Sequence, residues 1–244
     1  MNKNVFQFKQ FAVRQDRCAM KVGTDGVLIG AWAKGGNNIL DIGTGTGIIA
    51  MMMAQRYPQA MICGLDIDAD ACLQATENIV AAEFANRITI CNTALQQHNG
   101  TYDAIVSNPP YFENSLKAPD EKRAIARHTC TLSVKDLLTG VSRMLSANGT
   151  FSVIIPSEML CRYEEEAAIS GLFLSRLCNI RTVARKPVRR CMAQFCKLRP
   201  ETLVIEEQIL MNSDGTRSQW YRQENRCFLA NNMVCTKTYR RGCI

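Results

Sequence analysis

The stretch Ile39-Leu40-Asp41-Ile42-Gly43-Thr44-Gly45-Thr46-Gly47 decides the fold of this chain of 244 residues. Its apolar first half predicts a short buried strand, its three glycines predict a tight turn, and residues 48–56 have a helical composition. A strand, a glycine turn and a helix in this order open a βαβ nucleotide-binding unit. Glycine can adopt positive φ and lets a ligand approach the backbone closely. The stretch therefore predicts a ligand site at a sheet edge.

The spacing of the turn narrows the choice of ligand. It reads GxGxG instead of the GxGxxG of dinucleotide binders, and Asp41 precedes it. A carboxylate there repels a pyrophosphate but suits an amine or ribose hydroxyls, so S-adenosylmethionine fits better than NAD. The next strand, 61–65, ends at Asp66, which is 19 residues beyond Gly47. An acid at that place can accept two ribose hydroxyls, and its alternative role is to cap a helix over 69–82.

A second motif, Asn108-Pro109-Pro110-Tyr111, follows the apolar strand 102–106. Proline cannot donate to a sheet ladder, so the pair of prolines ends that strand. The side chain of Asn108 and the carbonyl of Pro109 are acceptors that suit an exocyclic amino group, and Tyr111 can stack on a planar ring. The alternative is a proline turn with a helix-capping asparagine. Because parallel strands bind ligands at their carboxyl edge, both motifs are expected at one edge.

The remaining elements continue an alternating β/α pattern. A turn at 23–25, with Thr24 or Asp25 as N-cap, is expected to start a short helix. We expect strands at 88–90 and 150–155, helices at 133–145 and 157–172, antiparallel hairpin strands at 177–181 and 192–196, and an edge strand at 203–205. Asn148-Gly149 is expected to end the first of these helices. The predicted division is a cover segment at 1–35, one ligand-binding domain at 36–210 and an irregular basic tail at 211–244.

Composition limits the class of protein. Hydrophobic residues make up 47% and charged residues 21%, which is typical of a globular chain. No apolar run is long enough for a membrane span, and no signal peptide is recognised. The 12 cysteines are scattered singly, which favours buried thiols over a disulfide framework, and two histidines argue against a His-rich metal site. The net charge of +7 favours an anionic partner.

Positive charge is concentrated on the expected hairpin. Residues 181–199 contain seven basic residues and no acidic one. Four of them, Arg185, Lys186, Arg189 and Arg190, fall on the expected hairpin loop, where they could contact an RNA backbone. The alternative is a solvated basic surface with no partner.

These motifs resemble a known family. The pattern of Asp41, three alternate glycines, Asp66 and Asn-Pro-Pro-Tyr resembles the S-adenosylmethionine-dependent amino-methyltransferases. The stretches 8–11, 16–26 and 30–32 are similar to those of the bacterial tRNA1(Val) adenine-N6 methyltransferases, and the similarity covers about residues 6–205. The resemblance implies a Rossmann-like class I methyltransferase fold, with a mostly parallel seven-stranded sheet, helices on both faces and a C-terminal antiparallel hairpin.

The resemblance also implies an activity: methyl transfer to N6 of an adenine in tRNA, next to the anticodon on its 3′ side. It implies a cytoplasmic protein, no membrane or metal partner, and a monomer. Ala94 departs from the family pattern, which usually has an acid at this place for the cofactor's adenine. The implied cofactor-binding residues are Lys21, Gly23, Thr24, Asp41, Gly43, Gly45, Gly47, Asp66, Ile67 and Asn108, and the implied catalytic residues are Asn108, Pro109, Pro110 and Tyr111.

Three alternatives stay open at the level of sequence. A protein glutamine-N5 methyltransferase could use the same Asn-Pro-Pro-Tyr motif, because a side-chain amide also presents a planar NH2. A DNA adenine methyltransferase needs the same chemistry, but 244 residues leave little room for a separate target-recognition domain. A non-catalytic RNA-binding module could keep the fold, although the intact motif residues argue against it.

Overall fold

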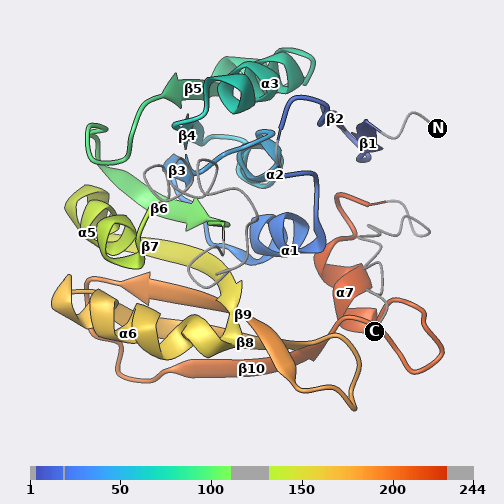
Figure 1. Cartoon of the computed structure of the whole chain (residues 1–244), viewed down its shortest axis with the longest axis vertical. Coiled ribbons are helices and arrows are strands. Elements are labelled where there is room, and N and C mark those ends of the chain that lie inside the picture. Colours follow the sequence, from blue (N-terminus) through green and yellow to red (C-terminus); the bar gives the residue numbers. More distant parts are fainter. Residues whose placement is uncertain (1–3, 19, 111–131, 230–244) are drawn as a thin grey trace, which may run out of the picture.

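The computed structural model describes residues 4–18, 20–110 and 132–229 (Figure 1). A small hairpin consists of β1 (Val5–Gln7) and β2 (Ala12–Arg14). The strands of the main sheet are β3 (Asn38–Ile42), β4 (Met61–Asp66), β5 (Ile88–Asn92), β6 (Tyr102–Ser107), β7 (Leu145–Pro156), β8 (Phe173–Arg181), β9 (Val188–Cys196) and β10 (Val204–Ile209). The helices are α1 (Thr24–Trp32), α2 (Ile48–Arg56), α3 (Ala69–Val80), α5 (Val134–Met144), α6 (Leu160–Ile169) and α7 (Gln219–Glu224), with short 3-10 turns at Ala85–Arg87 and Ser157–Met159.

The main sheet has the spatial order β10-β8-β9-β7-β6-β3-β4-β5. Among the described strands of this sheet, β9 alone runs against the others, because it pairs antiparallel with both β7 and β8. The predicted α/β class with a C-terminal antiparallel hairpin is therefore confirmed. The described part of the sheet has eight strands where seven were expected. The strand beyond the seven implied by the resemblance is β10, which corresponds to the edge strand that the residues predicted at 203–205. It pairs in parallel with β8 along Val204–Ile209 and is longer than predicted.

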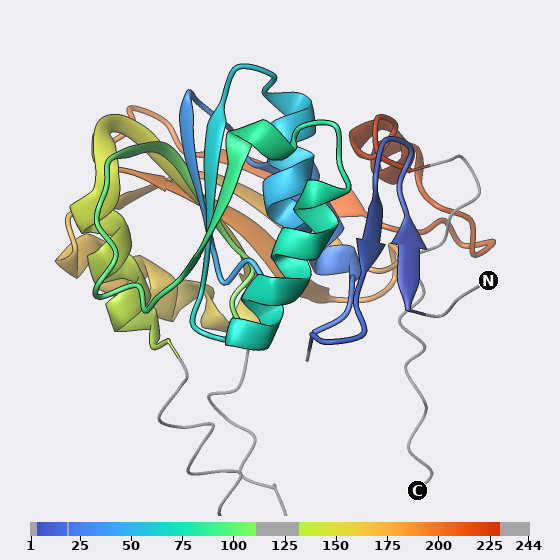
Figure 2. The same ribbon diagram turned by 90° about the horizontal axis from the view of Figure 1, so that it is seen from above.

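Helices cover both faces of the sheet, as Figure 2 shows. The chain alternates sides along each strand, so Ile39 packs with α1, α2 and α3, whereas the next residue, Leu40, packs with α5 and α6. In β6 the same alternation places Val106 on the first face and Ile105 on the second. Strands that are buried on both faces have the continuous apolar runs that the sequence shows.

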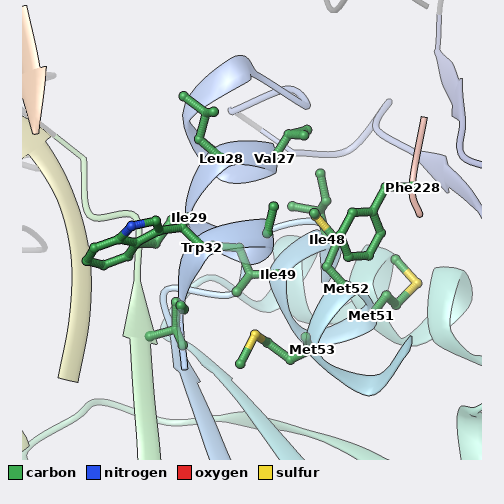
Figure 3. Packing of buried hydrophobic residues seen from close by; sticks show 14 of the residues in the cluster. Val27, Leu28, Ile29, Trp32, Ile48, Ile49, Met51, Met52, Met53 and Phe228 are labelled. Carbon is green, nitrogen blue, oxygen red and sulfur yellow. The ribbon is translucent and has the colours of Figure 1, made fainter. Parts of the chain in front are cut away.

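Helix α1 is part of the core. Its residues from 26 to 32 are all buried, and Figure 3 shows Val27 and Ile48 in one cluster with Phe228. A Cβ at Gly30 would lie 2.8 Å from Met52 Sδ, so a larger residue there would force the Met52 side chain to move where α1 packs on α2. The N-cap is Gly23, with extended backbone angles, so the expectation of a Thr24 or Asp25 cap was wrong.

Within the segment expected to be an irregular tail, the described residues include the short helix α7. The Oγ of Ser218 accepts a hydrogen bond from the backbone N–H of Tyr221 at 3.1 Å and so caps α7. Beyond this helix, Phe228 is buried in the cluster of α1 and α2. The backbone N–H of Lys9 donates to the carbonyl of Phe228 at 2.8 Å, which joins this segment to the turn of the N-terminal hairpin.

The boundary between α5 and β7 differs from the expectation. Helix α5 ends at Met144, and Asn148-Gly149 lies inside β7 because that strand begins at Leu145.

The cysteines at described positions are free thiols, among which Cys178 is fully buried. None of the described helices is both long and apolar enough to cross a bilayer.

Candidate active site

The glycine turn between β3 and α2 has the backbone conformation that its sequence predicts. Gly43, Gly45 and Gly47 have φ values of 71°, 54° and 79°, which residues other than glycine rarely adopt. The space around Gly43 is open, since a Cβ built there meets no atom within 4 Å. The turn therefore leaves its surface accessible to a ligand and directs the chain into α2.

Asp41 lies beneath this turn and is fully buried. Its Oδ2 accepts hydrogen bonds from the hydroxyl of Thr44 at 2.7 Å and from the backbone N–H of Ala50 at 3.2 Å. Ala50 is in the first turn of α2, so Asp41 caps a helix whose N-cap residue, Gly47, has no side chain to do so. Burial raises the pKa of Asp41 to about 7, although both hydrogen bonds oppose the shift. Asp41 holds the turn from below and does not line the cavity described next.

A cavity of about 560 Å³ opens above the turn. Gly43 and Gly45 line it on one side and Asn108 on another. The volume is in the range of small-molecule sites, and the lining combines the ends of β3, β4 and β6. The sequence predicted that these motifs share one edge, and the described residues of both contribute to this one cavity.

Asp66 ends β4 and lines the cavity together with Ile67. Its Oδ2 accepts the backbone N–H of Gly45 at 2.9 Å, and its Oδ1 accepts the backbone N–H of Asp68 at 3.0 Å. These bonds fix the carboxylate against the turn. Each oxygen retains a second lone pair for a hydroxyl of a ligand. The alternative role as a helix cap belongs to Asp68, whose side chain accepts from the first turn of α3.

The Asn-Pro-Pro segment follows β6 directly. The hydroxyl of Ser107 donates to the carbonyl of Ile42 at 2.8 Å, which ties the end of β6 to the end of β3. Asn108, Pro109 and Pro110 all line the cavity, with Pro109 buried and Pro110 exposed. Tyr111 lies outside the described residues.

The N-terminal segment contributes different residues from those expected. Lys21, Gly23 and Thr24 are not among the residues that line the cavity, whereas Cys18 and Met20 are. The pKa of Cys18 is raised to about 11, mainly by burial and further by nearby acids, of which Asp66 has the largest effect. Cys18 is therefore an uncharged thiol at neutral pH. Sequence reasoning missed both residues, although they lie within the N-terminal stretch that carried the family resemblance.

The segment is fixed over α3 by amide side chains. The Oε1 of Gln15 accepts the backbone N–H of Val22 at 2.8 Å. Asn78 of α3 bonds the carbonyls of Arg14 and Thr46 at 2.8 and 2.9 Å, which joins the N-terminal segment to the glycine turn. Buried polar groups with several partners of this kind fix one arrangement of the chain.

At the far side of the cavity, Ala94 and Gln96 follow β5. Ala94 offers no carboxylate, and the polar side chains near it in sequence that line the cavity are the hydroxyl of Thr93 and the exposed amide of Gln96. An amide can both donate to and accept from a purine edge.

The basic hairpin lies at the carboxyl edge of the sheet, because β8 ends at Arg181 and β9 begins at Val188. Arg185, Lys186 and Arg189 are exposed there. Arg190 differs from the expectation of a phosphate ligand that faces solvent. Its Nε lies 2.7 Å from Oδ1 of Asp25 and donates to Oδ2 at 2.8 Å, so it forms an ion pair with α1.

The residues present fit S-adenosylmethionine. The fit rests on an open turn of positive-φ glycines, a carboxylate at the cavity wall and the cavity volume. Comparison with solved structures shows the fold. A predicted O-methyltransferase from Agrobacterium tumefaciens superposes with a TM-score of 0.63 at 15% identity, covering 84% of this chain and 96% of that one. A methyltransferase from Pyrococcus furiosus has a TM-score of 0.51 at 20% identity, covering 70% and 80%.

Sequence comparison is more specific. The model of the methyltransferase small domain matches residues 22–166. A protein of Parabacteroides distasonis is 48% identical over 196 residues, which cover 78% of this chain and 82% of the relative. A protein of Trichodesmium erythraeum is 43% identical over 218 residues, covering 84% and 91%. Both are named tRNA1(Val) (adenine(37)-N6)-methyltransferase. By these matches the chain belongs to the methyltransferase small domain family and, within it, to the family of the tRNA1(Val) (adenine(37)-N6)-methyltransferases.

Proposed function

We propose that the protein transfers the methyl group of S-adenosylmethionine to the exocyclic N6 of an adenine in tRNA, at the adenine 3′ of the anticodon of tRNA1(Val). The observation that carries this proposal is the meeting of Asp66, the glycine turn and Asn108 in one cavity. A cofactor site and an acceptor for an amino group are thus adjacent. The names of the relatives, which concern tRNA, favour this substrate over protein glutamine.

The cofactor supplies an activated methyl group when it is bound. The turn at Gly43 and Gly45 and the carboxylate of Asp66 are the groups that would hold it, with Ile67 beside the carboxylate. Asp41 acts indirectly, because it caps α2 and keeps the turn in place. Lys21, Gly23 and Thr24 lie in the segment that covers this side, and we assign them no direct contact.

The target amine is a poor nucleophile, because its lone pair is delocalised into the purine. The side-chain oxygen of Asn108 and the carbonyl of Pro109 would accept its two hydrogens and favour a pyramidal nitrogen. No strong base is needed, since the proton can leave after transfer. Placement of the amine in line with the methyl group then supplies most of the rate. The base must leave its stack to enter the cavity, which is easiest in an anticodon loop.

The tRNA partner would be held by basic residues of the hairpin between β8 and β9. Arg185, Lys186 and Arg189 are exposed at the same edge as Asn108 and would contact the tRNA backbone. Such contacts position an RNA without reading its bases. A stacking role for Tyr111 and a monomeric state stay predictions. A tRNA substrate favours a cytoplasmic location for this activity.

The test is incubation of the purified chain with methyl-labelled S-adenosylmethionine and total tRNA, followed by nucleoside mass spectrometry. We expect label in N6-methyladenosine. The variant Asn108→Ala should lose turnover and keep near-normal cofactor affinity. The matched control is Asn99→Ala, which changes an exposed asparagine before β6, at the opposite edge of the sheet. Single-turnover methylation by Asn108→Ala within about threefold of wild type, well below a tenfold effect, would show that the assigned role is wrong. Absence of label from the tRNA would reject the substrate.

A further inference from the structure

We propose that Arg190 is a positioning residue for methyl transfer, which acts on Asn108 through Asp25 and the first turn of α1. This inference rests on the proposed function and adds a residue to its site. It replaces the expectation that Arg190 contacts a phosphate. The carrying observation is the ion pair between a strand at the substrate edge and the helix that borders Asn108.

The ion pair lies at the carboxyl edge of the sheet. Arg190 is opposite Pro156 in the register of β9 and β7, and Pro156 is the last residue of β7. The neighbouring strand β6 ends at Ser107, immediately before Asn108. Figure 1 shows α1 beside the ends of β6 and β7, which it contacts. Arg190 therefore holds α1 at the place where the substrate amine must enter.

The ion pair is the side-chain anchor of this helix end. Nε of Arg190 lies within 2.8 Å of both carboxylate oxygens of Asp25, which is only 15% exposed. The N-cap residue Gly23 has no side chain to cap the helix. The hydrogen bond from the backbone N–H of Val27 to the carbonyl of Gly23 is long, at 3.3 Å. An acid in the first turn also interacts favourably with the positive end of the helix dipole.

The first turn of α1 borders Asn108 directly. A Cβ at Gly26 would lie 3.9 Å from Nδ2 of Asn108, so the helix backbone forms one wall beside this amide. Gly26 follows Asp25, and a shift of the carboxylate therefore moves this wall. Small misplacements of a positioning group reduce rates strongly, by about a hundredfold for roughly 1 Å.

The test compares variants by single-turnover rate at saturating tRNA and cofactor, by tRNA affinity at several salt concentrations, and by thermal stability. Arg190→Gln and Asp25→Asn should each lower the rate by about tenfold or more, with tRNA affinity and its salt dependence unchanged. The double variant should be no slower than the slower single variant, because both changes break one interaction. Arg190→Lys should recover part of the rate, since it keeps the charge.

The matched control is Arg176→Gln. Its Nε lies 2.8 Å from Oε1 of Glu206, so this change breaks a similar pair, and Arg176 also stacks over Trp32 at the other end of α1. It should lower stability comparably and leave the rate within about threefold of wild type, short of a tenfold effect. An equal rate loss in Arg176→Gln would show general destabilisation and overturn the proposal.

Two other results would also overturn it. One is an unchanged rate in Arg190→Gln, and the other is weaker tRNA binding with a lower salt slope, which is the signature of a phosphate contact. If Arg190→Gln does not fold, Asp25→Asn and Arg190→Lys carry the comparison. A wild-type chain that does not methylate tRNA would reject the proposed function. In that case crystal structures of wild type and Asp25→Asn decide the inference, which requires displacement of the first turn of α1 and of Asn108.

Discussion

Replacement of Asp41 by asparagine should remove a pH dependence of stability that this one carboxyl imposes. Asp41 is fully buried, and its pKa is raised by burial from 3.8 to about 7. The folded chain therefore binds this proton more tightly than the unfolded chain does. Between about pH 4 and pH 7 the stabilising contribution of the protonated carboxyl is lost as the pH rises.

The magnitude follows from the size of the shift. About 3 pH units at 1.36 kcal/mol each give about 4 kcal/mol, of which about 3 kcal/mol falls between pH 5 and pH 8. The variant Asp41→Asn keeps an oxygen that can accept from Thr44 and Ala50, so the cap of α2 is retained. Its NH2 group occupies the place of Oδ1, which has no hydrogen-bond partner in the described part of the chain, at a cost that does not vary with pH.

The measurement is urea unfolding of both proteins without ligand at several values from pH 5 to pH 8. We expect the free energy of unfolding of wild type to fall relative to that of Asp41→Asn by about 3 kcal/mol over this range. The difference between the two proteins cancels the titration of all other groups. A constant difference would refute the argument, because it would mean that the buried carboxyl titrates near its ordinary pKa.

Two other predictions concern ligands. Asp66→Ala should weaken S-adenosylmethionine binding by roughly 1.5–3 kcal/mol for each lost hydrogen bond to the charged acceptor, as measured by calorimetry, and unchanged affinity would remove the ribose assignment. Replacement of Arg185, Lys186 and Arg189 by serine should weaken tRNA binding and lower the slope of log affinity against log salt by about 0.7–0.9 for each lost phosphate contact. Chemistry on the saturated complex should survive, and parallel salt slopes with equal affinities would show that the hairpin is only solvated surface.

Much of the fold was predictable because local patterns and tertiary structure agree. The run from Ile39 to Gly47 has one favourable arrangement, in which positive φ at three glycines turns the chain from a buried strand into a helix. Its strand, turn and helix were all found where expected. Asp66 and Asn108 could also be placed, since each follows a strand of the same parallel sheet and such strands share a ligand-binding edge.

The parts that could not be predicted depend on contacts between distant segments. In the sequence Arg190 is typical of a solvated cation, and only the packing of α1 against β7, the neighbour of β9, brings Asp25 to it. Asn148-Gly149 is typical of a helix end, but pairing of β7 with its neighbours already incorporates it into a strand. The sequence predicted that Asp41 contacts the cofactor. In the structure its carboxylate instead lies beneath the glycine turn and caps α2.

The contact of Phe228 with α1 and α2 has a consequence for the order of folding. Lys9 and Arg226 are 217 positions apart, and the Nζ of Lys9 donates to the carbonyl of Arg226 across that distance. Contacts of such high sequence separation form late, because the loop between them must close first. A nascent chain can thus assemble its sheet while the apolar seam between α1 and α2 is still uncovered. Until Phe228 has been synthesised and has docked, that apolar surface stays exposed, and exposed apolar surface of this kind favours aggregation.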